Sequence, residues 1–130
     1  MNEQPVLSER QFTEQNYWGL LASVDLYGCD PKMISNPDDI RAFVKALCQE
    51  IKMTRHGETL IDRFGDGTLE GYSFMQFIET SSITAHFDEP ENRAFIDVFS
   101  CKYFDPQVTA DFCKKFFKAE SSKVNILLRK

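Results

Sequence analysis

The chain reads Gly71-Tyr72-Ser73, then Thr80-Ser81-Ser82-Ile83-Thr84-Ala85-His86, and then Asp97-Val98-Phe99-Ser100-Cys101. These three segments place hydroxyl, imidazole and thiol side chains at fixed offsets from one another. Ser81 stands eight residues after Ser73 and five residues before His86. Cys101 follows Ser81 by twenty residues. The offsets surround the peptide bond between Thr80 and Ser81, which is a candidate self-cleaving bond.

The part of the chain before these segments predicts one strand and one helix. Residues 20–27 alternate apolar side chains with a more polar face, as a half-buried strand does, and Gly28 ends the run. The helix begins at Pro37, with Asn36 in position to cap it. Its apolar residues form one continuous stripe: Ile40, Phe43, Val44, Leu47, Cys48 and Ile51.

The rest of the chain predicts further strands and a second helix. We expect strands at residues 58–64, from residue 72 onward, at 93–101 and at 124–128, and a helix that the Asp105-Pro106 pair opens. This order favours an α/β (α+β) fold, a two-layer sandwich with helices on one face of a largely antiparallel sheet.

Composition narrows the class of protein. A chain of 130 residues with 42% apolar content fits one folded domain. The net charge of −5 disfavours nucleic acid and anionic membranes as partners, and no apolar run approaches the ~20 residues that span a bilayer. The four cysteines form no C-x-x-C pair, so we expect no metal site. The polar start, Met1 to Pro5, is no secretory signal, which favours reduced thiols in the cytoplasm.

Strand geometry restricts how the reactive residues can meet. In one extended segment the Cα atoms of Ser73 and Ser81 would lie about 26 Å apart, and His86 would point to the face opposite Ser81. Either the segment bends sharply, or Ser73 and His86 act on Ser81 of a second subunit.

The offsets resemble those of the prokaryotic S-adenosylmethionine decarboxylase proenzymes, a pyruvoyl-dependent family. The run from Val24 to Pro31 (Val-Asp-Leu-Tyr-Gly-Cys-Asp-Pro) is similar to that family's opening strand and turn. The resemblance covers residues 18–130 and leaves residues 1–17 as an N-terminal extension. It implies an S-adenosylmethionine decarboxylase-like sandwich, a role in polyamine (spermidine) biosynthesis, and a homodimer whose sites are shared across the interface.

The resemblance also implies a role for each reactive residue. Self-cleavage between Thr80 and Ser81 converts Ser81 into a covalent pyruvoyl cofactor, and Ser73 and His86 assist this processing. The ketone then forms an imine with the substrate amine and withdraws electrons as CO2 departs. Cys101 is the acid that protonates the carbanionic carbon.

The chain departs from the family around these residues. Thr80 replaces the usual glutamate before the serine, and Ser82 replaces the usual histidine after it. After His86 the family continues Thr-Trp-Pro-Glu, whereas this chain reads Phe-Asp-Glu-Pro-Glu. The carboxylates there, Asp88, Glu89 and Glu91, either receive a cationic substrate group or form a solvated acidic loop.

The sequence alone leaves two questions open, the role of Phe64 and the function of the chain. Phe64 is similar to the aromatic that stacks on the substrate's adenine, but a core phenylalanine is an equal alternative. For function, S-adenosylmethionine is the default substrate of a pyruvoyl-dependent carboxy-lyase. The alternatives are the same chemistry on arginine or ornithine, and an unprocessed homologue that serves as a binding or regulatory subunit.

Overall fold

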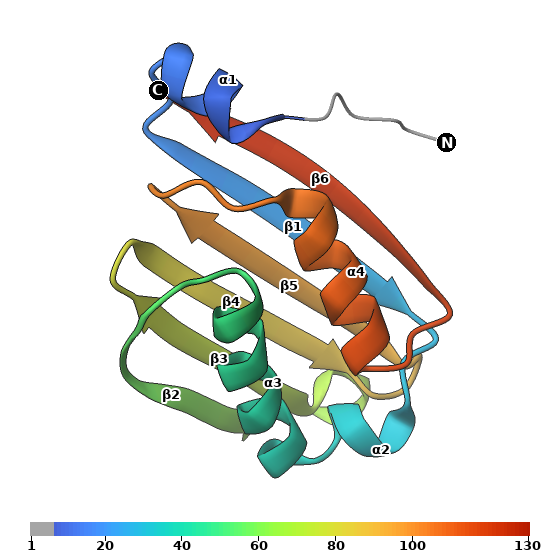
Figure 1. Ribbon diagram of the computed structural model, residues 1–130. Coiled ribbons are helices and arrows are strands. Elements are labelled where there is room, and N and C mark those ends of the chain that lie inside the picture. Colours follow the sequence, from blue (N-terminus) through green and yellow to red (C-terminus); the bar gives the residue numbers. More distant parts are fainter. Residues whose placement is uncertain (1–6) are drawn as a thin grey trace.

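The structure is a computed structural model that describes residues 7–130, so Met1 to Pro5 lie outside it. Its six strands form one antiparallel sheet in the order β2-β3-β4-β5-β1-β6 (Figure 1). The elements in chain order are α1 (Glu9–Glu14), β1 (Gly19–Tyr27), α2 (Pro31–Ile34), α3 (Pro37–Glu50), β2 (Arg55–Phe64), the 3-10 turn η1 (Gly67–Leu69), β3 (Gly71–Ile78), β4 (Ser81–Asp88), β5 (Arg93–Ser100), α4 (Pro106–Phe116) and β6 (Ser121–Arg129).

The core lies between the sheet and the helices α3 and α4, which cover the same face of it (Figure 1). The alternating residues of β1 are fully buried there: Leu20, Ala22, Val24 and Leu26. The stripe of α3 is buried against them, centred on Phe43, whose ring lies 4.6 Å from that of Phe117. The predicted two-layer fold, with helices on one face of an antiparallel sheet, is therefore confirmed. We call the other side of the sheet the helix-free face.

The two long helices begin where the sequence predicts. The side chain of Asn36 accepts hydrogen bonds from the backbone N–H groups of Asp38 at 2.9 Å and Asp39 at 3.4 Å. Asp105 accepts from Gln107 in the same way at 2.9 Å. Each cap satisfies N–H groups that the first helical turn leaves unpaired.

The expectation of one extended segment running through Ser73 and Ser81 was wrong. The chain reverses at Glu79 and Thr80, and β3 and β4 form a tight hairpin in which Ile78 pairs with Ser81. The sharp bend that strand geometry allowed is therefore present, but it leaves Ser81 five residues from His86 along β4, so action on Ser81 of a second subunit stays a prediction. The helices α1 and α2 were also not expected, and β2 begins at Arg55 rather than at residue 58.

Strand β2 is an edge strand, and its pairing with β3 is interrupted between His56 and Leu60. Gln76 of β3 is fully buried at this interruption. Its side-chain amide donates to the carbonyl oxygens of Phe77 at 2.7 Å and Gly57 at 3.0 Å, while its carbonyl accepts from the Thr59 hydroxyl. One side chain thus replaces the ladder hydrogen bonds that the irregular register loses.

Candidate active site

Ser73 and His86 form a hydrogen-bonded pair on the helix-free face. They lie directly opposite each other on β3 and β4, and the Ser73 Oγ is 2.7 Å from the His86 Nδ1. The alternate residues of β4, including Ile83 and Ala85, are fully buried on the helix side, whereas His86 is exposed. The hairpin therefore presents a serine and a histidine together to the outside of the sheet.

The candidate scissile bond lies at the other end of β4. Ser81 is the first residue of β4 and pairs with Ser100 of β5. The carbonyl oxygen of Thr80 accepts a hydrogen bond from the backbone N–H of Cys101, with 2.9 Å between nitrogen and oxygen. The pairing of β4 with β5 therefore brings Cys101 to the peptide bond that precedes Ser81.

Thr80 is also held by its side chain. Its Oγ1 lies 2.8 Å from the Oγ of Ser100, which in turn accepts from the backbone N–H of Lys102 at 2.9 Å. Sequence reasoning missed Ser100, a fully buried residue. A signal existed, because Ser100 is a polar residue at an inward-facing position of the predicted strand.

Cys101 differs from the other cysteines of the chain. Cys101 is exposed, whereas Cys29, Cys48 and Cys113 are buried. Burial raises the pKa of the Cys29 thiol to about 11 and also raises the pKa values of Cys48 and Cys113. A buried thiol with a raised pKa is a poor source of thiolate at neutral pH, so Cys101 is the cysteine placed for chemistry with a solute.

The Ser73–His86 pair and the Thr80–Ser81 bond do not meet within one protomer. Five residues of β4 separate Ser81 from His86, which corresponds to about 16 Å along an extended strand. Proton transfer requires roughly 3 Å between the heavy atoms. The structure thus brings Ser73 to His86, and Cys101 to Thr80 and Ser81, but it leaves these two pairs apart.

The three carboxylates after His86 are all engaged in ion pairs. Asp88 and Glu91 contact the guanidinium of Arg93 at 2.6 and 2.7 Å, and Glu89 contacts that of Arg63. Sequence reasoning missed both arginines. These hydrogen bonds raise the pKa of Arg93, mainly through Asp88, and that of Arg63, mainly through Glu89. The group is therefore an internally paired network and not a freely solvated acidic loop.

Arg63 connects three parts of the chain around this network. It contacts Glu70 at 2.6 Å, binds Glu89, and places its guanidinium 5.0 Å from the ring centre of Tyr72. It thereby joins the end of β2, the loop after η1 and the turn after β4.

A cleft of about 540 Å³ adjoins this network, and three of the predicted site residues line it: His86, Asp88 and Glu91. Leu69, Arg93 and Phe95 complete much of its wall. Phe64 is 57% exposed at the end of β2, so it is not a core phenylalanine. That alternative is excluded, while a substrate contact at Phe64 stays a prediction.

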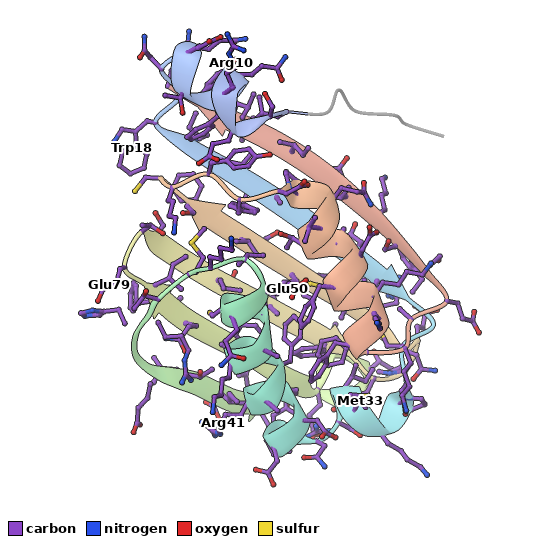
Figure 2. The ribbon with its side chains drawn as sticks, in the orientation of Figure 1. Arg10, Trp18, Met33, Arg41, Glu50 and Glu79 are labelled. Atoms are coloured by element: carbon purple, nitrogen blue, oxygen red, sulfur yellow. The ribbon has the colours of Figure 1, made fainter. Side chains whose placement is uncertain are left out.

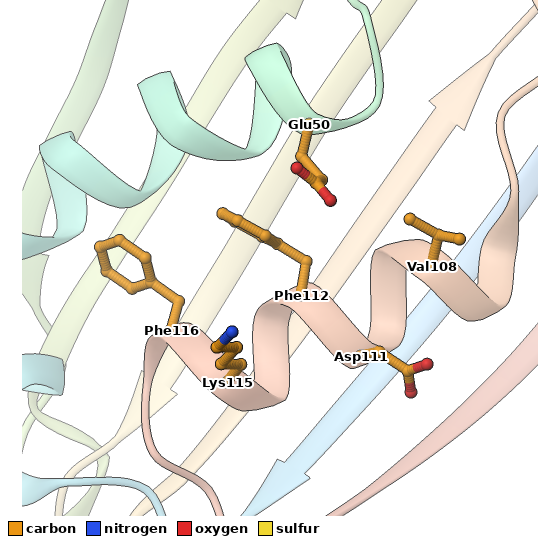
Figure 3. A pocket seen from close by; sticks show the side chains of 6 residues that line it. All are labelled: Glu50, Val108, Asp111, Phe112, Lys115 and Phe116. Atoms are coloured by element: carbon orange, nitrogen blue, oxygen red, sulfur yellow. The ribbon is translucent and has the colours of Figure 1, made fainter.

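A second cavity, of about 640 Å³, lies on the opposite side of the sheet between α3 and α4 (Figure 3). Phe112 and Phe116 project into it from α4, and Glu50 faces them from the end of α3 (Figure 3). It contains none of the predicted site residues. Within residues 7–130, no three His, Cys, Asp or Glu side chains group as metal ligands would. No helix in the same range has the length and apolar character required to cross a membrane.

Comparison with known proteins agrees with this arrangement. The S-adenosylmethionine decarboxylase family profile matches residues 21–130. The S-adenosylmethionine decarboxylase proenzyme of Pyrococcus furiosus is 28% identical over 107 residues, covering 82% of this chain and 74% of that protein. The proenzyme of Bacillus velezensis is 30% identical over 98 residues, covering 75% and 74%.

A solved structure shares the fold. The crystal structure of the adenosylmethionine decarboxylase from Aquifex aeolicus superposes with a TM-score of 0.73 at 22% identity, covering 87% of this chain and 91% of that one. The profile, the relatives and the sheet with its helices on one face lead to the same conclusion: this chain belongs to the S-adenosylmethionine decarboxylase family.

Proposed function

We propose that the chain is a pyruvoyl-dependent decarboxylase that acts on S-adenosylmethionine in polyamine biosynthesis and is made from a self-cleaving proenzyme. The observation that carries the proposal is the hydrogen bond from the Cys101 N–H to the Thr80 carbonyl oxygen. Family membership supplies the reaction class, since the relatives are named S-adenosylmethionine decarboxylase proenzymes.

Cleavage starts with attack of the Ser81 hydroxyl on the Thr80 carbonyl carbon. The oxygen–carbon bond forms as the amide nitrogen departs, which gives an ester and a free amine on Ser81. Loss of the Ser81 α-proton then expels the Thr80 carboxylate and leaves dehydroalanine, and water releases ammonia from its imine tautomer to give the ketone. The Cys101 N–H already donates to the oxygen on which negative charge develops, which is the arrangement that lowers the barrier of acyl transfer.

The residues present fit a pyruvoyl group at position 81. Ser81 supplies its carbon atoms, the backbone of Cys101 contacts the preceding carbonyl, and the exposed Cys101 side chain is open to a bound substrate. When formed, the group draws electrons from the substrate α-carbon as CO2 leaves. Cys101 then donates the proton that the α-carbon needs.

A homodimer reconciles the separated residue pairs. The helix-free face exposes the apolar side chains of Leu60, Met75 and Phe77 on β2 and β3, and of Leu127 on β6. Exposed apolar surface of this kind is typical of protein–protein interfaces. A second copy on this face covers it, and in the proposed dimer Ser73 and His86 of one protomer act on the Thr80–Ser81 bond of its partner at the end of the hairpin. We place this assembly in the cytoplasm, where its thiols stay reduced.

The ion pairs weigh against the guanidinium of arginine and the ammonium of ornithine as groups that would hydrogen-bond to these carboxylates. A cationic side chain would compete with Arg93 for Asp88 and Glu91, and with Arg63 for Glu89. Displacing a bound guanidinium offsets the gain from binding another cation. The carboxylates thus act as partners of Arg93, which lines the cleft, and of Arg63, which binds the adjacent Glu89.

Intact-mass spectrometry of the purified protein tests the proposal. We expect two fragments, residues 1–80 and residues 81–130, the second with a blocked N-terminus that hydrazine or borohydride traps. CO2 release from labelled S-adenosylmethionine should exceed release from labelled arginine or ornithine. Ser81→Ala should give neither fragments nor CO2. A parent protein that keeps one full-length mass and carries no trappable carbonyl would refute the enzyme and leave the unprocessed homologue.

A further inference from the structure

The N-terminal segment, residues 7–18, lies outside the family profile yet contacts the chain on both sides of Cys101. The ring of Phe12 packs against Tyr103, two residues after Cys101, with ring centres 5.9 Å apart. The indole of Trp18 stacks on Phe99, two residues before Cys101, at 6.0 Å. The N-terminal segment therefore contacts residues that lie two positions before and two positions after Cys101.

The contact with Tyr103 combines a buried ring with a hydrogen bond. Phe12 is only 6% exposed although it belongs to a helix of six residues. The Tyr103 hydroxyl donates to the carbonyl oxygen of Leu7 at 2.6 Å. Burial, and then the charges of Asp105 and Glu9, raise the pKa of Tyr103, so the hydroxyl keeps the proton that it donates.

The N-terminal segment is itself prepared for this contact. Ser8 and Gln11 form a reciprocal capping box that starts α1. The backbone N–H of Trp18 donates to the carbonyl oxygen of Arg129 at 2.7 Å, which joins the end of the segment to β6. The capping box thus defines where α1 begins, and the bond to Arg129 anchors residue 18 to the sheet.

The remaining side of the loop is held by the sheet. The backbone N–H groups of Cys101 and Lys102 donate to Thr80 and Ser100, and the Lys102 ammonium donates to the carbonyl oxygen of Lys52 at 2.9 Å. Without α1, nothing among these contacts restrains Tyr103. The loop would then be held by the sheet at its start and by the buried Phe104 at its end, but it would lose the aromatic contact and the hydrogen bond of the Tyr103 side chain.

We propose that residues 7–18 form a clamp that positions the Cys101 thiol, with Phe12 and Tyr103 as its positioning residues. The catalytic consequence rests on the proposed function, because Cys101 is there the proton donor. The restraint of the Cys101 thiol does not rest on the proposed function, because the clamp holds the thiol whether or not the chain is processed. Small misplacements of a reacting group can cost about 10²-fold in rate. The clamp therefore affects the rate of proton transfer from Cys101, while the affinity for substrate stays the same.

The experiment compares Phe12→Ala and Tyr103→Phe with a matched control, Arg10→Ala. Arg10 is on the same helix, points away from the sheet and makes an exposed ion pair with Glu14 (Figure 2). Two quantities are measured: the rate at which iodoacetamide alkylates Cys101 in the folded protein, located by mass spectrometry, and the steady-state constants of decarboxylation. The buried cysteines do not compete on this timescale.

We expect Phe12→Ala to alkylate about tenfold faster and to lose about tenfold in kcat with an unchanged KM, with smaller changes of the same sign in Tyr103→Phe. Arg10→Ala should match the parent.

Alkylation within twofold of the parent in both variants would overturn the clamp. Faster alkylation with unchanged kcat would overturn its catalytic role. Tyr103→Phe removes a single oxygen, so it decides the question if Phe12→Ala does not fold. A parent without decarboxylase activity would refute the proposed function, and the alkylation rates would still decide the clamp.

Discussion

The Nδ1 atom of His86 lies 2.7 Å from the Oγ of Ser73, although thirteen residues separate the two in sequence. Antiparallel pairing of β3 with β4 puts them at one register position, so the pair is already assembled before any partner arrives. The same register carries Ser81 to the opposite end of β4. A single hairpin therefore separates Ser81, where we propose cleavage, from the pair that we propose assists it.

Subunit complementation should reveal this separation. Ser81→Ala and His86→Ala proteins, each expressed alone, should remain uncleaved. When the two are co-expressed, the mixed dimer contains one site with Ser81 from one chain and His86 from the other. We expect mass spectrometry to find fragments of the His86→Ala chain only. Cleavage of neither chain in the mixed dimer would show that the pair acts within one protomer.

Replacing the Cys101 side chain should separate processing from decarboxylation. Cys101→Ala keeps the backbone N–H that donates to Thr80, so cleavage should proceed at nearly the parent rate. Decarboxylation should fall by about 10²- to 10⁴-fold, the usual contribution of a general acid. Fragment formation and CO2 release from the same preparation measure both. An alanine variant that decarboxylates at the parent rate would exclude the thiol as proton donor.

Arg63 should affect substrate binding and leave processing unchanged. Arg63→Ala removes the contacts to Glu70, Glu89 and the Tyr72 ring that join three segments beside the cleft. We expect KM to rise about tenfold, equivalent to about 1.4 kcal/mol, with cleavage at Thr80 unaffected. Arg63→Lys restores one charge but not the bidentate geometry and should fall between the two. An unchanged KM in Arg63→Ala would show that the ion pairs do not shape the substrate site.

Gln76 should be important for stability. Gln76→Leu keeps the size of the side chain but leaves the Thr59 hydroxyl and the Gly57 and Phe77 carbonyls without their partner. We expect the free energy of unfolding to fall by about 2–3 kcal/mol, measured by urea denaturation. Gln49→Leu, on the exposed side of α3, is the control and should change it by less than about 0.5 kcal/mol. Equal effects of the two substitutions would contradict this role.

Stability should decrease in alkali because of the buried thiols. The pKa of Cys29 is about 11 in the folded protein, above the value of 9.0 for a free thiol. A group whose pKa is raised on folding contributes fully below its unfolded pKa, and its contribution is lost as the pH rises through the folded pKa. Urea midpoints under reducing conditions should thus fall between pH 9 and pH 11. Cys29→Ala should make this decline shallower, and an identical decline would assign it to other groups.

Local pattern was sufficient for the long helices α3 and α4 and for strand β1, whereas α1 and α2 were not predicted. Leu20 and Val24 sit at alternate positions and are fully buried, and Asn36 caps α3 as its residue type indicates. The β3–β4 turn escaped prediction because tight hairpin turns usually contain Gly or Asn, whereas this one contains Glu79 and Thr80. Because this turn was not predicted, strands β3 and β4 appeared as one long extended segment.

The candidate site was predictable in its residues but not in its pairing. Offsets along the chain selected Ser73 and His86, yet only the register of the hairpin places them opposite each other. Arg63 and Arg93 gave no sequence signal, because an arginine in a strand is common and its partners come from other elements. Likewise, the contact of Phe12 with Tyr103 spans most of the chain and depends on the tertiary structure.

The interruption in β2 affects how copies of this chain can associate. An intact edge strand offers a regular row of backbone donors and acceptors onto which further strands can add, one molecule after another. Here Gly57, with a φ of +79°, and the missing register between His56 and Leu60 break that row. Growth into filaments along this border is therefore disfavoured, which is compatible with the closed dimer that we propose through the helix-free face.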